Sequence, residues 1–126
     1  MRARRGAGFT LIEILVVMSI IALLLALAVP RYFQSVTRAQ ESVLKENLTL
    51  IRDALDKHYA DTGKYPGTLA ELVSKRYLRK LPDDPVAGSD GIWVVVPPDR
   101  PEKGGVFDVK SGAAGNSLSG VPYNQW

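Results

Sequence analysis

The sequence has no cysteine and a single histidine, His58, among its 126 residues. Without cysteine there is no disulfide, no cysteine-based catalysis and no thiolate metal site. A zinc site needs three or four clustered ligands, which one histidine with scattered aspartates does not supply. His58 lies beside Tyr59 in a helical pattern, and we interpret it as a surface or boundary histidine of a helix. The sequence therefore predicts no enzyme.

The sequence also has little net positive charge outside its first five residues. The net charge of +3 comes from 16 lysines and arginines against 13 acids, but Arg2, Arg4 and Arg5 lie within the first five positions. Beyond these three arginines, 13 basic residues balance the 13 acids. The charge gives no reason to expect nucleic acid as a partner.

Polar residues are almost absent from residues 9–29, where only Thr10, Glu13 and Ser19 interrupt an apolar run. As a helix rising about 1.5 Å per residue, this run spans roughly 31 Å, which matches the hydrocarbon core of a bilayer. The arginines before it favour a cytoplasmic N-terminus by the positive-inside rule. The run can therefore cross a membrane and place everything after Pro30 on the far side.

Glu13 is the anomaly in this run. A carboxylate in a membrane helix costs about 2.5–3.5 kcal/mol at mid-bilayer and normally has a partner, yet no arginine lies inside the run. If the chain were cut between Gly8 and Phe9, the new amino terminus would lie one helical turn from Glu13. The amine would be equally reachable by Glu13 of a staggered neighbour.

Residues 8–13 read GFTLIE and, with the long apolar helix and Pro30 near its end, resemble the N-terminus of type IV pilins and of type II secretion pseudopilins. The resemblance implies cleavage after Gly8 by a prepilin peptidase and N-methylation of Phe9. It also implies that Glu13 neutralises the Phe9 amine of a neighbouring subunit during assembly.

Two other interpretations of the N-terminus compete with this one. A plain single-span anchor explains the apolar run but not Glu13. A secretory signal peptide is indicated by Ala26, Leu27 and Ala28, which have the small-x-small form of a cleavage site and would leave an N-terminus at Val29. Against the signal peptide, the run is longer than the usual 7–15 residues and contains an acid.

Residues 30–61 change from wholly apolar to amphipathic, which predicts that the helix beginning at Phe9 continues to about Asp61 and buries one face against the following domain. Pro30 removes one backbone hydrogen bond and clashes with the preceding turn, so we expect a kink or local melting there. Glu41 and Lys45 form an i,i+4 pair that we interpret as part of a solvated face.

The second half of the sequence predicts a short helix and a hairpin. Thr68 and Glu71 form a capping box that opens a helix ending near Lys75. Residues 92–96 and 106–110 are the convincing strands and predict an antiparallel hairpin. A lone hairpin is marginal, so it must lie on the long helix or gain a third strand from the C-terminal segment. Residues 111–126 predict a loop held by Tyr123 and Trp126.

Residues 61–66 (DTGKYP) and 77–85 (YLRKLPDDP) narrow the resemblance to the major pseudopilin of type II secretion rather than a pilus pilin. It implies an α+β, type IV pilin-like fold, in which a long N-terminal helix, membrane-spanning in its first half, packs on a small antiparallel sheet domain. The expected divisions are a leader (1–8), a transmembrane and filament-core helix (9–29), its amphipathic continuation (30–61) and a periplasmic globular domain (62–126).

The C-terminal end departs from the family. Val86 stands where tryptophan commonly follows Asp-Pro, and residues 112–120 contain no acid where the family usually has several aspartates that hold calcium. The weak calcium candidates that remain are Asp84, Asp90 and Asp108. We therefore expect the domain to fold without calcium or another cofactor, with the two C-terminal aromatic side chains packing the loop instead.

The resemblance implies a structural pseudopilus subunit that is anchored in the bacterial inner membrane and assembled there to drive protein export. The implied partners are further copies of the chain in a helical filament, the prepilin peptidase, an inner-membrane assembly platform, minor pseudopilins and the lipid bilayer. Two alternatives stay open. One is a type IV pilus pilin or minor pilin, and the other is an anchored or secreted binding module without an assembly role.

Overall fold

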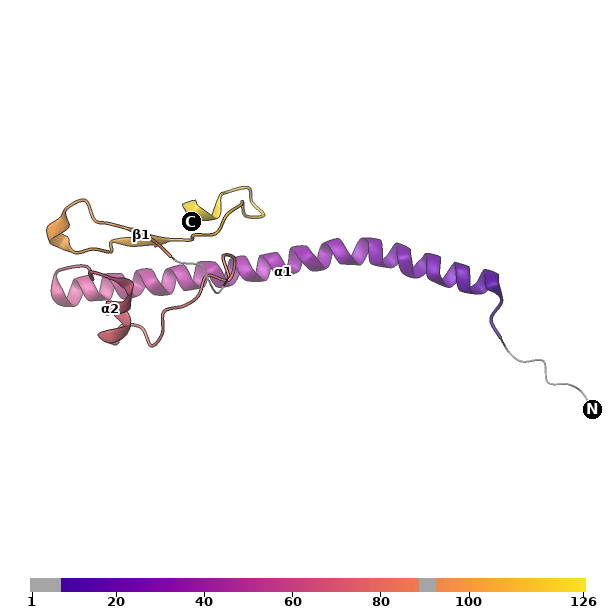
Figure 1. The fold of residues 1–126 in the computed structure, drawn as a ribbon, viewed down its shortest axis with the longest axis horizontal. Coiled ribbons are helices and arrows are strands. Elements are labelled where there is room, and N and C mark those ends of the chain that lie inside the picture. Colours follow the sequence, from indigo (N-terminus) through magenta and orange to yellow (C-terminus); the bar gives the residue numbers. More distant parts are fainter. Residues whose placement is uncertain (1–7, 89–92) are drawn as a thin grey trace, which may run out of the picture. The chain divides into compact units, whose positions relative to one another are not determined.

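The computed structural model describes residues 8–88 and 93–126. Its elements in chain order are the helices α1 (Leu11–Thr62) and α2 (Leu69–Ser74), strand β1 (Val94–Val96), the short 3-10 helix η1 (Pro101–Lys103), strand β2 (Asp108–Lys110) and the 3-10 helix η2 (Tyr123–Gln125) (Figure 1). The chain divides into two compact units, Met1–Val36 and Thr37–Trp126. Each unit is described by itself.

Helix α1 confirms the long helix that the sequence predicts. It ends at Thr62 because Gly63, with a φ of 75°, leaves the helical conformation and donates its N–H to the carbonyl of Tyr59 at 2.8 Å. Pro30 lies inside α1, which continues through it. Of the expected kink or local melting, melting is therefore not seen in the isolated subunit. A proline deletes a single backbone donor, and the hydrogen bonds of the surrounding turns hold the helix.

Helix α2 forms where predicted, but its N-terminus is capped differently. Thr68 occupies the N-cap position without a side-chain hydrogen bond, and Glu71 accepts the N–H of Gly67 at 2.6 Å instead. Glu71 also pairs with Lys75 at 2.9 Å. The bond from Lys75, followed by that from Gly67, holds the pKa of Glu71 below its ordinary value. The predicted reciprocal capping box is therefore wrong, because only Glu71 reaches back, and it does so to the N–H of Gly67 rather than of Thr68.

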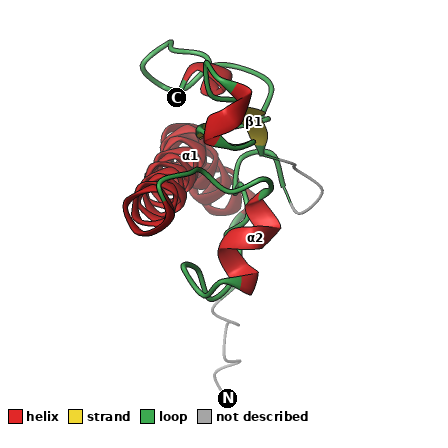
Figure 2. Cartoon of the chain, turned by 90° about the vertical axis from the view of Figure 1, so that its left-hand side faces the viewer, coloured by secondary structure: helices red, strands yellow, loops and turns green. Residues whose placement is uncertain are grey.

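Strands β1 and β2 form the predicted antiparallel hairpin, with Val95 opposite Val109. Each strand is shorter than expected, and Ile92 of the first predicted strand lies outside the described residues. The sheet of the described residues has two strands, so the hairpin gains its support from the long helix. Figures 1 and 2 show the hairpin and α2 flanking the second half of α1 on different sides.

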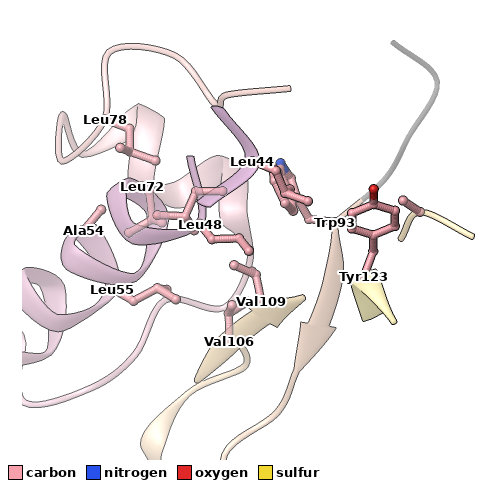
Figure 3. Packing of buried hydrophobic residues seen from close by; sticks show 12 residues of the cluster. Leu44, Leu48, Ala54, Leu55, Leu72, Leu78, Trp93, Val106, Val109 and Tyr123 are labelled. Carbon is pink, nitrogen blue, oxygen red and sulfur yellow. The ribbon is translucent and has the colours of Figure 1, made fainter. Parts of the chain in front are cut away.

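The core of the second unit lies between these elements (Figure 3). Its α1 side chains recur at helical spacing, as expected for the buried face of an amphipathic helix. The hairpin contributes Val106 and Val109, and α2 contributes Leu72. The remaining buried apolar residues are Leu44, Leu48, Ile51, Ala54, Leu55, Leu78, Trp93, Ala113 and Tyr123.

Candidate functional site

The first turn of α1 is built by Thr10. Its hydroxyl accepts the N–H of Glu13 at 3.2 Å and its carbonyl accepts the N–H of Ile14 at 3.2 Å, so Thr10 is the N-cap of the helix. Glu13 thereby lies in the first turn, where a negative charge is favourable beside the unpaired N–H groups. This cap was not predicted from the sequence, although Thr10 and Glu13 have capping-box spacing.

The apolar surface of the first unit is bare. Phe9 is 79 % exposed, and all the large apolar side chains from Leu11 to Val29 are also exposed. In the part of the chain that the structure describes, α1 alone is long and apolar enough to cross a membrane, and none of its most apolar window is buried. Such a surface needs lipid or other subunits to cover it.

The residues expected to act in processing and assembly lie at this end. Gly8 and Phe9 immediately precede the capped turn that holds Glu13, whereas Pro30 lies further along α1. Within residues 8–88 and 93–126, Glu13 forms no ion pair; the two pairs found there join Arg52 to Asp108 and Lys75 to Glu71. Glu13 is thus a carboxylate without a cationic partner in the described part of its own subunit.

Asp84, the first calcium candidate, is committed to the protein's own groups. It is 1 % exposed, and one carboxylate oxygen accepts the N–H groups of Val86 and Ala87 at 2.9 and 3.0 Å. The other oxygen accepts a short hydrogen bond from the hydroxyl of Ser111. Asp84 therefore joins the connector after α2 to the end of β2.

Asp108 is equally committed. It accepts from the Arg52 guanidinium at 2.8 Å and from the N–H of Val109 at 2.8 Å. Asp90, the third calcium candidate, lies outside the described residues. Among the residues that are described, no three side chains of histidine, cysteine, aspartate or glutamate gather as a metal site would require.

Glu41 connects α1 to the C-terminal segment, a role that its sequence pattern did not predict. Its carboxylate accepts the N–H of Leu118 and the hydroxyl of Tyr123, both at 2.8 Å. Burial, and then this hydrogen bond, raise the pKa of the Tyr123 hydroxyl. The predicted pairing of Glu41 with Lys45 is therefore wrong, because Glu41 turns toward the C-terminal loop and Lys45 lies over the Trp126 ring at 4.9 Å.

Arg52 makes a second connection between α1 and the C-terminal segment. Besides its bond to Asp108, its guanidinium donates to the carbonyl of Val109 at 3.0 Å and to the main-chain oxygen of Trp126 at 2.9 Å. Tyr123 and Trp126 pack edge to face, with ring centroids 5.4 Å apart. The expectation that these two aromatic residues hold the last segment is confirmed, and two charged side chains of α1 assist them.

His58 is 2 % exposed, so its interpretation as a surface or boundary histidine is wrong. Its Nδ1 lies 2.6 Å from the carbonyl oxygen of Lys64, which fits an Nδ1–H donor. Its Nε2 is buried and has no hydrogen-bond partner in the described part of the chain. The ring packs 5.3 Å from that of Tyr77, so His58 is part of the packing around the end of α1.

Comparison with known proteins agrees with this geometry. A family model described as the prokaryotic N-terminal methylation motif matches residues 3–29. The type II secretion system core protein G of Pseudomonas aeruginosa is 39% identical over 101 residues, which cover 68% of this chain and 71% of the relative. That of Klebsiella pneumoniae is 35% identical over 103 residues, covering 69% and 73%. That of Vibrio cholerae is 27% identical over 144 residues, covering 99% and 94%. No solved structure matches the chain significantly.

The methylation motif, the capped apolar helix and the small sheet domain packed on its second half together define a type IV pilin-like protein. Within that class, the chain belongs to the type II secretion system core protein G family, the major pseudopilins.

Proposed function

We propose that the chain is made as a prepilin in the bacterial inner membrane, cut after Gly8, methylated at Phe9 and assembled into a short periplasmic pseudopilus. The leader would be residues 1–8, the membrane-spanning and filament-core helix residues 9–29, its continuation residues 30–61 and the periplasmic domain residues 62–126. One observation carries the proposal: the methylation motif leads directly into an apolar helix whose side chains are exposed in the subunit.

The proposed work is mechanical. The exposed apolar helices leave lipid and pack against one another in the filament, which covers their surfaces again at little hydrophobic cost. The small domains form the outside, and growth at an inner-membrane platform pushes the exported protein. The proposed partners are further copies of this chain, the prepilin peptidase, that platform and minor pseudopilins.

Glu13 would act in docking. After cleavage, the Phe9 ammonium of an incoming subunit would pair with the Glu13 carboxylate of a subunit already in the filament. Each charge then neutralises the other, so neither remains isolated in lipid. Thr10 holds the first turn around Glu13 in a fixed conformation before docking. Pro30 would let neighbouring backbone groups rearrange as subunits pack, because it already lacks a donor.

The test replaces Glu13 by valine and compares filament yield with that of wild type and of Glu46→Val, an exposed glutamate further along α1. We expect Glu13→Val to insert and to be cleaved normally, because an apolar side chain suits lipid better than a carboxylate. Filaments should be lost, because the neighbouring Phe9 ammonium then has no counter-ion. Wild-type filament yield from Glu13→Val would contradict the charge-pair mechanism.

A further inference from the structure

The C-terminal loop, residues 112–120, closes without any acidic side chain of its own. The resemblance to major pseudopilins implies a calcium ion here, and calcium takes six to eight oxygens, usually including several carboxylates. The loop offers only carbonyls, hydroxyls and Asn116. Asp84 and Asp108, the described acids expected to help, already accept from backbone amides, Ser111 and Arg52. The donor set does not fit calcium.

Glu41, a residue of α1, holds this loop from outside it through hydrogen bonds. One oxygen of its carboxylate accepts hydrogen bonds from both Leu118 and Tyr123, which lie 77 and 82 residues away in sequence. Hydrogen bonds to an ionised acceptor are roughly twice as strong as neutral ones. Tyr123 is 5 % exposed, so its hydroxyl needs an acceptor inside the protein. One carboxylate thus holds the tip of the loop to Tyr123, which follows the loop in η2.

Backbone bonds within the loop and to the two residues after it supply the rest of its closure. The N–H of Ser117 donates to the carbonyl of Val121 at 2.8 Å, and the N–H of Gly120 donates back to Ser117 at 2.9 Å. Asn116 and Pro122 form an isolated antiparallel bridge. These bonds engage the carbonyl oxygens of Val121 and Ser117 within the protein itself.

We propose that Glu41 is the positioning residue that closes the C-terminal loop in place of a metal ion, so that the domain reaches its assembly-competent form without calcium. A negative side chain from the long helix draws in backbone and hydroxyl donors, whereas a calcium ion would draw in oxygen acceptors. The statement about assembly rests on the proposed function; the statement about the loop does not.

The experiment uses the full-length processed chain in detergent, with excess calcium and with chelator. We expect the Tm of wild type to agree within about 1 °C in the two conditions. Glu41→Ala should lower the Tm by about 5–10 °C in both conditions, because two charge-assisted bonds are lost from a small domain. Glu46→Ala, the matched control on the same helix, should leave the Tm within about 1 °C of wild type.

A second readout keeps the proposal testable if Glu41→Ala folds poorly. Tyr123→Phe keeps the ring and removes one of the two donors, and Glu41→Gln keeps an oxygen while removing the charge. In each variant, hydrogen exchange at the Leu118 amide should be at least about tenfold faster than in wild type under native conditions. Exchange at Leu118 that is unchanged in both variants would overturn the proposal.

The measurements with calcium can also contradict the proposal. A Tm that rises by many degrees with calcium in wild type would mean that the loop binds the ion. If Glu41→Ala also removed that rise, Glu41 would be a metal ligand rather than a replacement for one. Absence of filaments from the wild-type chain, with Tm and hydrogen exchange as expected, would instead count against the proposed function and leave the loop mechanism intact.

Discussion

At the scale of single residues, two glycines decide how closely the loop before β2 approaches the turn after α1. The N–H of Gly105 donates to the carbonyl of Pro66 at 3.1 Å, and the backbone N–H of Tyr65 donates to the carbonyl of Lys103 at 2.6 Å. A Cβ on Gly104 would lie 2.2 Å from the carbonyl oxygen of Tyr65, and one on Gly105 would lie 2.4 Å from that of Gly67. Both obstacles are backbone atoms, so neither can rotate away.

Gly105→Ala should therefore destabilise the domain by about 2 kcal/mol or more, because the two segments must separate. Gly67→Ala is the control, since its added Cβ would make an ordinary contact of 3.7 Å with the Glu71 side chain. Denaturant unfolding of the two variants beside wild type measures the difference. Equal stability of Gly105→Ala and Gly67→Ala would show that the loop can move aside cheaply.

The raised pKa of Tyr123 gives a prediction for alkaline pH. Burial, then the hydrogen bond to Glu41, favour the neutral hydroxyl in the folded state. This contribution is complete below the ordinary pKa of about 10 and is lost as pH rises through the folded-state pKa. Measurements at about pH 9 and about pH 11 bracket the ordinary tyrosine pKa. Between them, the Tm of wild type should fall more than the Tm of Tyr123→Phe. Parallel curves would contradict this coupling.

Residue roles were the least predictable from sequence. The partners of Glu41 and the burial of His58 depend on segments far away in the chain or on the turn after α1, and helical spacing alone carries no information about them. Trp93 donates its indole N–H to the carbonyl of Pro82 at 2.7 Å, and the spacing of residues in the sequence does not predict this contact either. The Thr10 cap was different, because its spacing to Glu13 was visible in the sequence.

At the scale of elements, Arg52 joins α1 to β2 and to the C-terminal segment. Its planar guanidinium donates to three separate oxygens, which a lysine ammonium on its flexible stem cannot match in the same geometry. The pair with Asp108 is partly exposed, so its Coulomb energy is screened, and the geometry of the three bonds matters more than the charge.

Arg52→Lys should accordingly lose nearly as much stability as Arg52→Met, about 1–2 kcal/mol in each case. Arg38→Lys, an exposed arginine on the same helix, should change the free energy of unfolding by less than about 0.5 kcal/mol. Chemical denaturation of the three variants tests this. A lysine at position 52 that preserves wild-type stability would mean that charge alone is sufficient there.

The elements themselves were largely predictable. The C-terminal end of α1, helix α2 and the antiparallel hairpin follow from hydrophobic period, glycine and proline positions and β-branched runs, whereas α1 begins at Leu11 rather than at Phe9. The lengths of the strands and the cap of α2 were not, because they depend on which backbone groups find partners in neighbouring loops. The continuous helix through Pro30 shows the same limit, since a local penalty was outweighed by the turns on either side.

At the scale of the whole molecule, the chain has two units with different surfaces. The second unit buries its own core and closes its last segment with Glu41 and Arg52. The first unit exposes an apolar surface that its own chain leaves uncovered in the described residues. The central claim of the proposed function is that lipid covers this surface before assembly and that neighbouring subunits cover it afterwards.

The most direct measurement of that claim is the intact mass and N-terminal sequence of the chain recovered from membranes of cells that express it with a prepilin peptidase. The account predicts a chain that begins at Phe9 and carries one methyl group on its amine, and it predicts that Gly8→Ala slows this cleavage. A chain that keeps its first eight residues would indicate a plain anchor, and one that begins at Val29 would indicate a signal peptide. Either result would contradict the account.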